Sequence, residues 1–228
     1  MKNLNIYFKT ILMLCCLSSL LFAQETRTKI AIVDTGIDLS RNLALMAFLC
    51  HQEQADFTSS TLLDTSGHGT TMAGLITQGL DSSKYCISIL KVWDRGGNAC
   101  RIVKALNTAM SYNVSYVNIS MSGDEYSFSE RQVIEAPVAK GVVVTMAAGN
   151  EGQNLDRKCQ VFPACYSIKG AYVVGALEHG TTAGYSNYGQ TVNAWAPGSN
   201  QCVNGWCVSG TSAATANFLN YLIKHETR

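Results

Sequence analysis

Short apolar segments recur along the chain and alternate with longer segments in which apolar residues repeat every three or four positions. A short apolar run rich in β-branched residues is typical of a buried strand, whereas the longer repeat is typical of one face of a helix. The runs that predict strands are 29–33, 44–50, 86–92, 114–120, 141–147 and 171–176. The segments that predict helices begin at 66–70 and at Ser212, and extend over 100–112 and 129–140.

This alternation predicts the fold. Strands that alternate with helices favour a mostly parallel sheet covered by helices on both faces, an α/β fold of three layers. Pro137 is expected to kink or shorten the helix over 129–140, because proline lacks an N–H and clashes with the preceding turn. No internal repeat, linker or low-complexity segment divides the chain. We therefore expect residues 24–228 to form a single domain, and the protein to be a monomer.

Residues 1–23 have the pattern of a secretory signal peptide. Lys2 and Lys9 give a positive start, residues 11–22 are apolar, and Ala23 ends a sequence that resembles a cleavage site. An apolar run of 12 residues is shorter than the ~20 that a spanning helix needs. The sequence therefore predicts an exported protein, secreted or periplasmic, with no stable membrane insertion after the signal is removed.

Charge excludes some partners. Charged residues make up 14% of the chain, against roughly 25% in an average protein, and the formal net charge is +1. No basic run stands out. The sequence therefore favours neither nucleic acid nor an anionic membrane surface as a partner.

Seven of the nine cysteines follow the signal segment, and export makes disulfides possible. Cys202 and Cys207 flank a predicted turn at Asn204-Gly205 and form the best-supported pair. Cys159 and Cys165 bracket a loop and form the second. Sequence alone does not fix the connectivity. Three cysteines remain, which allow one more bridge at most and leave a spare thiol: Cys50, Cys86 and Cys100.

Polar side chains stand where predicted strands end and predicted helices begin. Asp34 follows the first strand and Asn150 lies just beyond the strand over 141–147. His68 and Ser212 each open a helix. Ligands of such sheets bind beyond the carboxyl ends of the strands, so these groups can meet at one edge. Each alone has an ordinary explanation as a turn, loop or capping residue, but their joint occurrence favours a chemical site.

The motifs around these residues resemble those of the subtilases, the subtilisin-like serine peptidases. The Asp, His, Ser order is the known order of subtilisin. The resemblance covers about residues 29–216 and implies a subtilisin-like fold. The motifs that carry it are Ile32-Val33-Asp34-Thr35-Gly36, Ser66-Gly67-His68-Gly69-Thr70, Ala147-Ala148-Gly149-Asn150 and Ser209-Gly210-Thr211-Ser212.

The resemblance implies a serine endopeptidase that cleaves polypeptides through an acyl-enzyme on Ser212. His68 is then the general base, and Asp34 orients its imidazole. The side-chain amide of Asn150 and the backbone N–H of Ser212 bind the oxyanion. An extended substrate pairs as an added strand, and a pocket receives the residue before the scissile bond. The residues implied for substrate binding are Ser120, Met121, Ser122, Gly123, Ala147, Ala148 and Gly149.

No cofactor is implied, and the short loop at 79–84 predicts no obligatory metal. Two departures from the family pattern leave other functions open. Only residues 24–28 precede the first strand, where subtilases carry a pro-segment of domain size, and the segment after Ser212 is short. The alternative is a subtilase-like pseudoenzyme or peptide-binding protein without turnover. A third interpretation is a disulfide-stabilised structural module, against which the intact polar groups argue.

Overall fold

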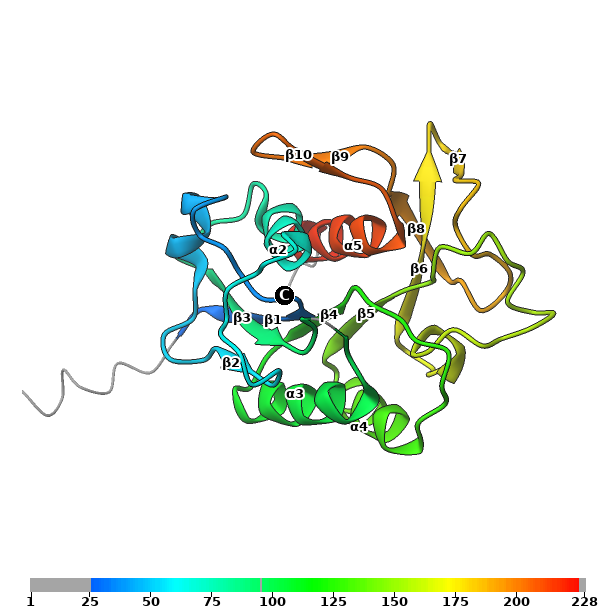
Figure 1. The fold of residues 1–228 in the computed structure, drawn as a ribbon, viewed down its shortest axis with the longest axis horizontal. Coiled ribbons are helices and arrows are strands. Elements are labelled where there is room, and N and C mark those ends of the chain that lie inside the picture. The colour runs from blue at the N-terminus through cyan, green and yellow to red at the C-terminus, as the bar shows by residue number, and fades with distance from the viewer. Residues whose placement is uncertain (1–25, 95, 226–228) are drawn as a thin grey trace, which may run out of the picture.

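The computed structural model describes residues 26–94 and 96–225, so the predicted signal peptide lies outside the described residues. A mostly parallel sheet lies between two layers of helices, as the alternation of the sequence predicts (Figure 1). The strands of this sheet are β1 (Thr28–Asp34), β2 (Ala55–Asp56), β3 (Tyr85–Lys91), β4 (Tyr116–Ile119), β5 (Val143–Ala147), β6 (Tyr172–Glu178), β7 (Thr181–Thr182) and β8 (Ala194–Pro197). The helices are η1 (Leu43–Phe48), α2 (His68–Thr77), α3 (Ala99–Ser111), α4 (Phe128–Ala139), η2 (Ala164–Tyr166) and α5 (Thr211–His225).

The order of the strands places the chain's central motifs side by side. The sheet runs β2-β3-β1-β4-β5-β6-β7, and β8 also pairs with β6. Neighbours are parallel except for β6 and β7. The carboxyl ends of β1, β4 and β5 therefore lie next to one another, at the middle of one edge.

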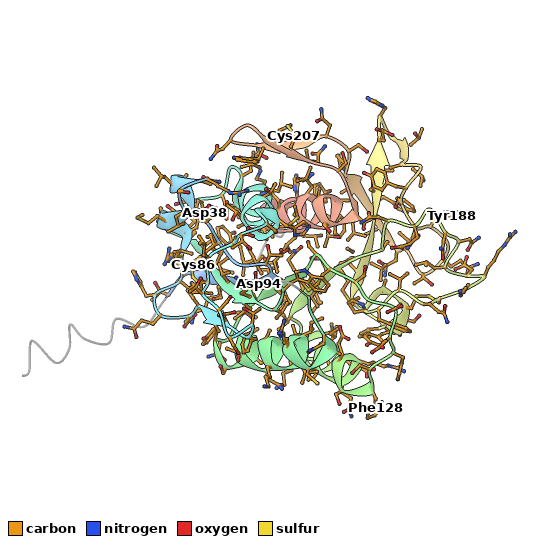
Figure 2. All side chains as sticks on the ribbon, viewed as in Figure 1. Asp38, Cys86, Asp94, Phe128, Tyr188 and Cys207 are labelled. Atoms are coloured by element: carbon orange, nitrogen blue, oxygen red, sulfur yellow. A yellow bond between two sulfur atoms is a disulfide. The ribbon has the colours of Figure 1, made fainter. Side chains whose placement is uncertain are left out.

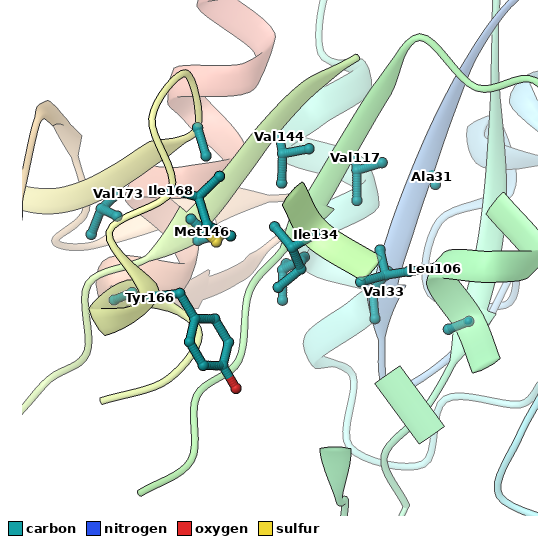
Figure 3. Close-up of a cluster of buried hydrophobic side chains, with 14 of the residues drawn as sticks. Ala31, Val33, Leu106, Val117, Ile134, Val144, Met146, Tyr166, Ile168 and Val173 are labelled. Carbon is teal, nitrogen blue, oxygen red and sulfur yellow. The ribbon is translucent and has the colours of Figure 1, made fainter. Parts of the chain in front are cut away.

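Alternate residues of β1 face opposite layers, as the pleat of a strand requires. Ile30 and Ile32 pack with side chains of α2 and α5. Ala31 and Val33 pack on the opposite side with side chains of α3 and α4 (Figure 3). All of these β1 side chains are fully buried. The continuous apolar run thus arises because both faces of the strand are covered.

The strand predicted over 44–50 is wrong. Leu43–Phe48 forms the 3₁₀ helix η1, in which only Leu45 is buried, while Leu43 and Met46 are 69% and 59% exposed. A short apolar run does not distinguish a buried strand from a helical turn by periodicity. The edge strand β2 lies instead in the polar segment after η1, where its two residues pair with β3.

The predicted helices form within one or two residues of their expected ends. α4 ends at Ala139, two residues after Pro137, so the proline lies in the last turn and the helix is short. No helix among residues 26–94 and 96–225 is long and apolar enough to cross a bilayer.

The cysteine predictions are confirmed. Disulfides join Cys159 to Cys165 and Cys202 to Cys207, and the third joins Cys50 to Cys86 and leaves Cys100 as a free thiol. Cys86 and Cys207, which belong to two of these bridges, are labelled in Figure 2.

The Cys202–Cys207 bridge spans a two-stranded hairpin, β9 (Gln201–Val203) and β10 (Trp206–Val208). Its turn has φ of 50° at Asn204 and 81° at Gly205. Two positive φ values are those of a type I′ turn, for which Asn-Gly is the preferred sequence.

Candidate active site

An acid–base pair lies at the carboxyl edge of the sheet. Asp34 is the last residue of β1, and His68 is the first residue of α2. Asp34 Oδ1 lies 2.7 Å from His68 Nδ1; the Asp34 side chain is fully buried and the His68 side chain is 34% exposed. Because an ionised carboxylate only accepts, Nδ1 donates this bond and the neutral ring keeps its lone pair on Nε2.

The charge of Asp34 changes the basicity of His68. Attraction to the Asp34 carboxylate raises the pKa of His68 above its ordinary 6.5, and this outweighs burial, which lowers it. The hydrogen bond that His68 donates to Asp34 and the charge of Asp64 also raise this pKa. The pair therefore holds an imidazolium ion more readily than a free histidine does.

Asp64 is a buried anion that the sequence reasoning missed. It accepts six hydrogen bonds, from the backbone and side chains of the segment 66–70 and from Thr35 Oγ1. Thr35 Oγ1 in turn accepts from Gly69 N at 2.8 Å. Asp64 therefore ties the residue after Asp34 to the residues on both sides of His68. The sequence signal available was an aspartate four residues before the histidine in a polar loop.

Asp64→Asn is expected to lower the free energy of unfolding by about 2–4 kcal/mol, because an amide cannot accept on both sides and leaves the backbone N–H of Gly67 or Thr70 unpaired. Burial alone would raise the pKa of Asp64, but hydrogen bonds from Thr70, Thr35 and Gly67 outweigh it and lower the pKa below its usual 3.8. This contribution is present above pH 3.8 and is lost as the pH falls through the lowered pKa.

Denaturant unfolding at neutral and acidic pH measures this effect of Asp64→Asn. The difference from wild type is expected to shrink in acid. Asp81→Asn is the matched control, because Asp81 also accepts backbone and side-chain hydrogen bonds but lies in an exposed turn. Equal stability of both variants at neutral pH would contradict the assigned role of Asp64.

Ser212 approaches the same edge from α5, in which it is the second residue. Its Oγ donates to the carbonyl oxygen of Ser120 at 2.9 Å, and Ser120 Oγ donates to the carbonyl of Ser212 at 3.3 Å. Ser120 follows β4, whose Ile119 is paired with Val33 of β1, so Ser120 lies beside Asp34. Among the described hydrogen bonds, none joins Ser212 to His68, because the hydroxyl is turned toward Ser120.

Asn150 follows β5 and is held beside the start of α5. Its Oδ1 accepts from Thr211 N at 2.8 Å and from Thr211 Oγ1 at 3.1 Å. Both bonds use the carbonyl end of the amide, so the NH₂ end keeps its donors. A Cβ placed on Gly210 would lie 3.5 Å from Asn150 Oδ1, which Thr211 occupies, 3.6 Å from Asn150 Nδ2 and 3.8 Å from Ser212 N. The absence of a side chain at Gly210 thus leaves a space that borders two N–H donors.

The segment expected to pair with an extended substrate continues from Ser120. Ser120 is buried, Met121 is half-buried, and Ser122 and Gly123 are exposed. Gly123 exchanges backbone hydrogen bonds of 2.9 and 2.8 Å with Phe162. The backbone of Gly123 is therefore already paired, and the edge free for an added strand is shorter than 120–123.

The other segment expected to bind substrate, 147–149, is buried, and hydrogen bonds to Thr211 and Asn187 hold its backbone in place. The Gly149 N–H donates to Thr211 Oγ1 at 3.1 Å, and Asn187 Nδ2 donates to the Ala148 carbonyl at 2.9 Å. Asn187 also donates to the carboxylate of Glu151 at 2.5 Å. Ala147 and Ala148 are 2% and 0% exposed. Within residues 26–94 and 96–225, no group of three His, Cys, Asp or Glu side chains could hold a metal ion.

The chain is similar to known proteins over nearly all of the described residues. A sequence model described as the Subtilase family matches residues 25–218. A subtilisin-like protease of Coccidioides posadasii is 34% identical over an alignment of 188 residues, and the match covers 72% of this chain and 44% of that protein. Subtilisin E of Bacillus subtilis is 29% identical over an alignment of 187 residues, and the match covers 76% of this chain and 47% of that protein. This chain thus spans about half the length of these relatives.

Solved structures share the fold. A lanthipeptide protease superposes with a TM-score of 0.72 at 21% identity, over 87% of this chain and 74% of that one. A cold-adapted subtilisin-like serine proteinase superposes with a TM-score of 0.69 at 22% identity, over 87% and 76%. At these low identities, the superpositions show that the fold is shared.

Proposed function

The chain belongs to the subtilase family of serine peptidases, and on that premise we propose that it is an exported serine endopeptidase. It hydrolyses polypeptides through an acyl-enzyme on Ser212, with His68 as general base and Asp34 as the group that orients it. The hydrogen bond between Asp34 and His68 carries this proposal, because it leaves the Nε2 lone pair available for a proton. The disulfides are consistent with export.

The reaction begins when the Ser212 hydroxyl turns from the carbonyl of Ser120 to His68. Oγ attacks the carbonyl carbon of the peptide while Nε2 takes the hydroxyl proton. The C–N bond then breaks, and the imidazolium gives its proton to the leaving amine. A water molecule, deprotonated by His68, attacks the ester carbon, the bond to Ser212 Oγ breaks, and the imidazolium returns the proton to Oγ as the acid leaves. The buried charge of Asp34 stabilises the imidazolium at each transfer.

The tetrahedral oxyanion is stabilised at the space left open by Gly210. The NH₂ group of Asn150 and the backbone N–H of Ser212 border this space, and α5 directs its N-terminus toward it. Donors fixed before the reaction stabilise charge as it develops, without reorganisation. Thr211 supports this arrangement because it occupies the carbonyl end of the Asn150 amide.

The hydrogen bond from Ser212 to Ser120 favours one alternative function. A hydroxyl held away from its base is not activated, as expected of a peptide-binding protein or pseudoenzyme without turnover. A fluorophosphonate probe and a casein hydrolysis assay on the purified, folded protein distinguish the two functions. An endopeptidase is labelled on Ser212 and cleaves casein. Folded protein that does neither, yet binds peptides, would establish the alternative.

Asn150→Ala is expected to lower kcat by about 10²–10³-fold with a smaller change in KM, the effect known for the corresponding amide of subtilisin itself. The reason is that the variant lacks a donor whose hydrogen bond to the oxyanion forms only in the transition state. Kinetics on a peptide substrate measure both constants. Asn107→Ala is the control, because Asn107 is exposed on α3 in the opposite helical layer. A loss of less than about tenfold at Asn150 would remove it from the proposed oxyanion site.

A further inference from the structure

Asn118 of β4 and Thr145 of β5 are polar residues inside two central strands of the sheet. They are register partners, and both are fully buried. Their neighbours within these strands pack in the cluster with α3 and α4: Val117, Val144 and Met146 (Figure 3), and Ile119. Because alternate residues of a strand face opposite layers, Asn118 and Thr145 lie on the face that packs against α5.

Burial makes the hydrogen bonds of this pair important, because a buried amide or hydroxyl is destabilising unless it is hydrogen-bonded. Thr145 Oγ1 donates to Asn118 Oδ1 at 3.2 Å and lies farther, at 3.4 Å, from the carbonyl oxygen of Val117. Asn118 Nδ2 donates to Ser120 Oγ at 2.7 Å. The proton of Thr145 therefore determines which end of the Asn118 amide faces Ser120.

This chain of hydrogen bonds ends at Ser212. A hydroxyl group has a single proton, and an NH₂ group only donates. Ser120 Oγ accepts from Asn118, so its own proton is directed elsewhere, and it donates to the Ser212 carbonyl at 3.3 Å. Ser120 is only 2% exposed. In such a buried chain each hydrogen bond polarises the next and strengthens it.

The contact between Ser120 Oγ and the Ser212 carbonyl fixes the start of α5 relative to β4. Ser212 carries the proposed nucleophile, and its N–H is one of the two proposed oxyanion donors. The hydroxyl of Ser212 has to turn from the Ser120 carbonyl to His68 during the reaction, whereas the Ser212 carbonyl can remain bound to Ser120 Oγ throughout. This matters because a displacement of about 1 Å at a reacting group can cost about 10²-fold in rate.

We propose that Asn118 is a positioning residue for Ser212, that it acts through the hydroxyl of Ser120, and that Thr145 holds the Asn118 amide in the required orientation. The inference rests on the proposed function, since it assigns a further residue to the same reaction. Asn118 is fully buried, so a bound peptide does not reach it. Its loss should therefore lower kcat and leave KM nearly unchanged.

Asn118→Leu has a similar size and cannot donate to Ser120. We expect it to lower kcat by about 10–100-fold, with KM within about threefold of wild type. Ser120→Ala removes the hydroxyl but keeps the backbone carbonyl, and should cause a similar loss. The double variant should lose no more than either single variant, because both changes interrupt the same chain.

Thr145→Val gives a sharper test, because Thr145 is separated from Ser212 by two side chains of the chain. We expect this isosteric change to lower kcat by about two- to tenfold, the effect of one hydrogen bond. In a Ser120→Ala background it should have no effect on kcat. An equal effect of Thr145→Val with and without the Ser120 hydroxyl would overturn the inference, even if Asn118→Leu failed to fold.

Asn220→Leu is the matched control. Asn220 also lies on α5, and its amide also joins α5 to another element, because it donates to the carbonyls of Ile76 and Gln78 at 2.7 and 2.9 Å. It lies two turns after Ser212. This variant should lose stability and keep the kcat of wild type. A folded Asn118→Leu protein with kcat within about threefold of wild type would contradict the role of Asn118.

Hydrogen exchange separates this inference from the proposed function. The backbone amides of residues 213–216 should exchange about tenfold faster in Asn118→Leu and Ser120→Ala than in wild type, and at the wild-type rate in Asn220→Leu. If wild type cleaves nothing but these amides respond as expected, the proposed function fails and the positioning of Ser212 stands. If wild type cleaves peptides while neither kcat nor exchange responds, the proposed function stands and the positioning role is wrong.

Discussion

Ser212→Ala is expected to lower the turnover of a peptide substrate by about 10⁶-fold, the loss known for the nucleophile of subtilisin itself. The variant has no oxygen to form the acyl bond, so only binding and the oxyanion donors remain to accelerate attack by water. The fold should persist. Within the described part of the chain, the side chain of Ser212 makes one hydrogen bond, to the carbonyl of Ser120, and Ala213 and Ala214 already occupy buried positions on the same helix.

Single-turnover and steady-state kinetics on a fluorogenic peptide measure this loss, with fluorophosphonate labelling as an independent readout. Ser111→Ala is the matched control. Ser111 also lies in a helix, and its Oγ also donates to one backbone carbonyl, that of Thr108 at 2.7 Å. The control should retain wild-type turnover and labelling. A Ser212→Ala protein that is still labelled, or that retains turnover within about tenfold of wild type, would mean that another residue is the nucleophile.

The sequence predicts the layers well because burial and periodicity agree in the central strands. In β1, every residue from Ile30 to Val33 is apolar and fully buried, between two helical layers. The prediction fails at η1, where Leu43 and Met46 are apolar but exposed. Whether an apolar residue is buried depends on which elements pack against it, and the local sequence does not reveal those elements. The short strands β7 and β8 were not predicted, because their pairing with β6 is tertiary.

The candidate site likewise contains residues that local motifs predict and residues whose role appears only in the folded chain. Asp34 and His68 stand in local motifs, and their hydrogen bond follows from the order of the strands. Asp64 stands in a polar loop, and its importance appears only when donors from two separate segments converge on it. Asn118 lies inside β4, whose other residues are tyrosine, valine and isoleucine. Its hydrogen bond from Thr145, 27 residues away, is a property of the folded chain.

Asp34→Asn is expected to lower kcat by about 10⁴-fold, as the equivalent change does in trypsin-like peptidases. An asparagine can present its NH₂ group to Nδ1 of His68, which then becomes an acceptor. The proton moves to Nε2, and the imidazole can no longer take the hydroxyl proton of Ser212. Ser212 itself is untouched by the change, so kcat separates the orientation of the base from the presence of the nucleophile.

The pH profile gives a second, independent measure of Asp34→Asn. Catalysis needs neutral His68, so kcat/KM of wild type should rise with pH through the raised pKa, with a midpoint above 6.5. Without the charge of Asp34, the pKa of His68 falls, so the midpoint at which the residual activity rises with pH should move to a lower pH. The stabilising effect of the ion pair is present below pH 6.5 and is lost as the pH rises through the raised pKa. The stability difference between wild type and Asp34→Asn should therefore be larger in mild acid than in base.

Asp156→Asn is the control for the loss of one negative charge, because Asp156 is exposed and accepts hydrogen bonds from the backbone of Gln190. It should leave both kcat and the midpoint of the profile unchanged. If Asp34→Asn kept the wild-type midpoint, the charge felt by His68 would have to come from elsewhere, and Asp64 is the remaining carboxylate that acts on it. A buried carboxylate that sets both the tautomer and the basicity of one imidazole predicts that kcat and the midpoint change together in a single variant.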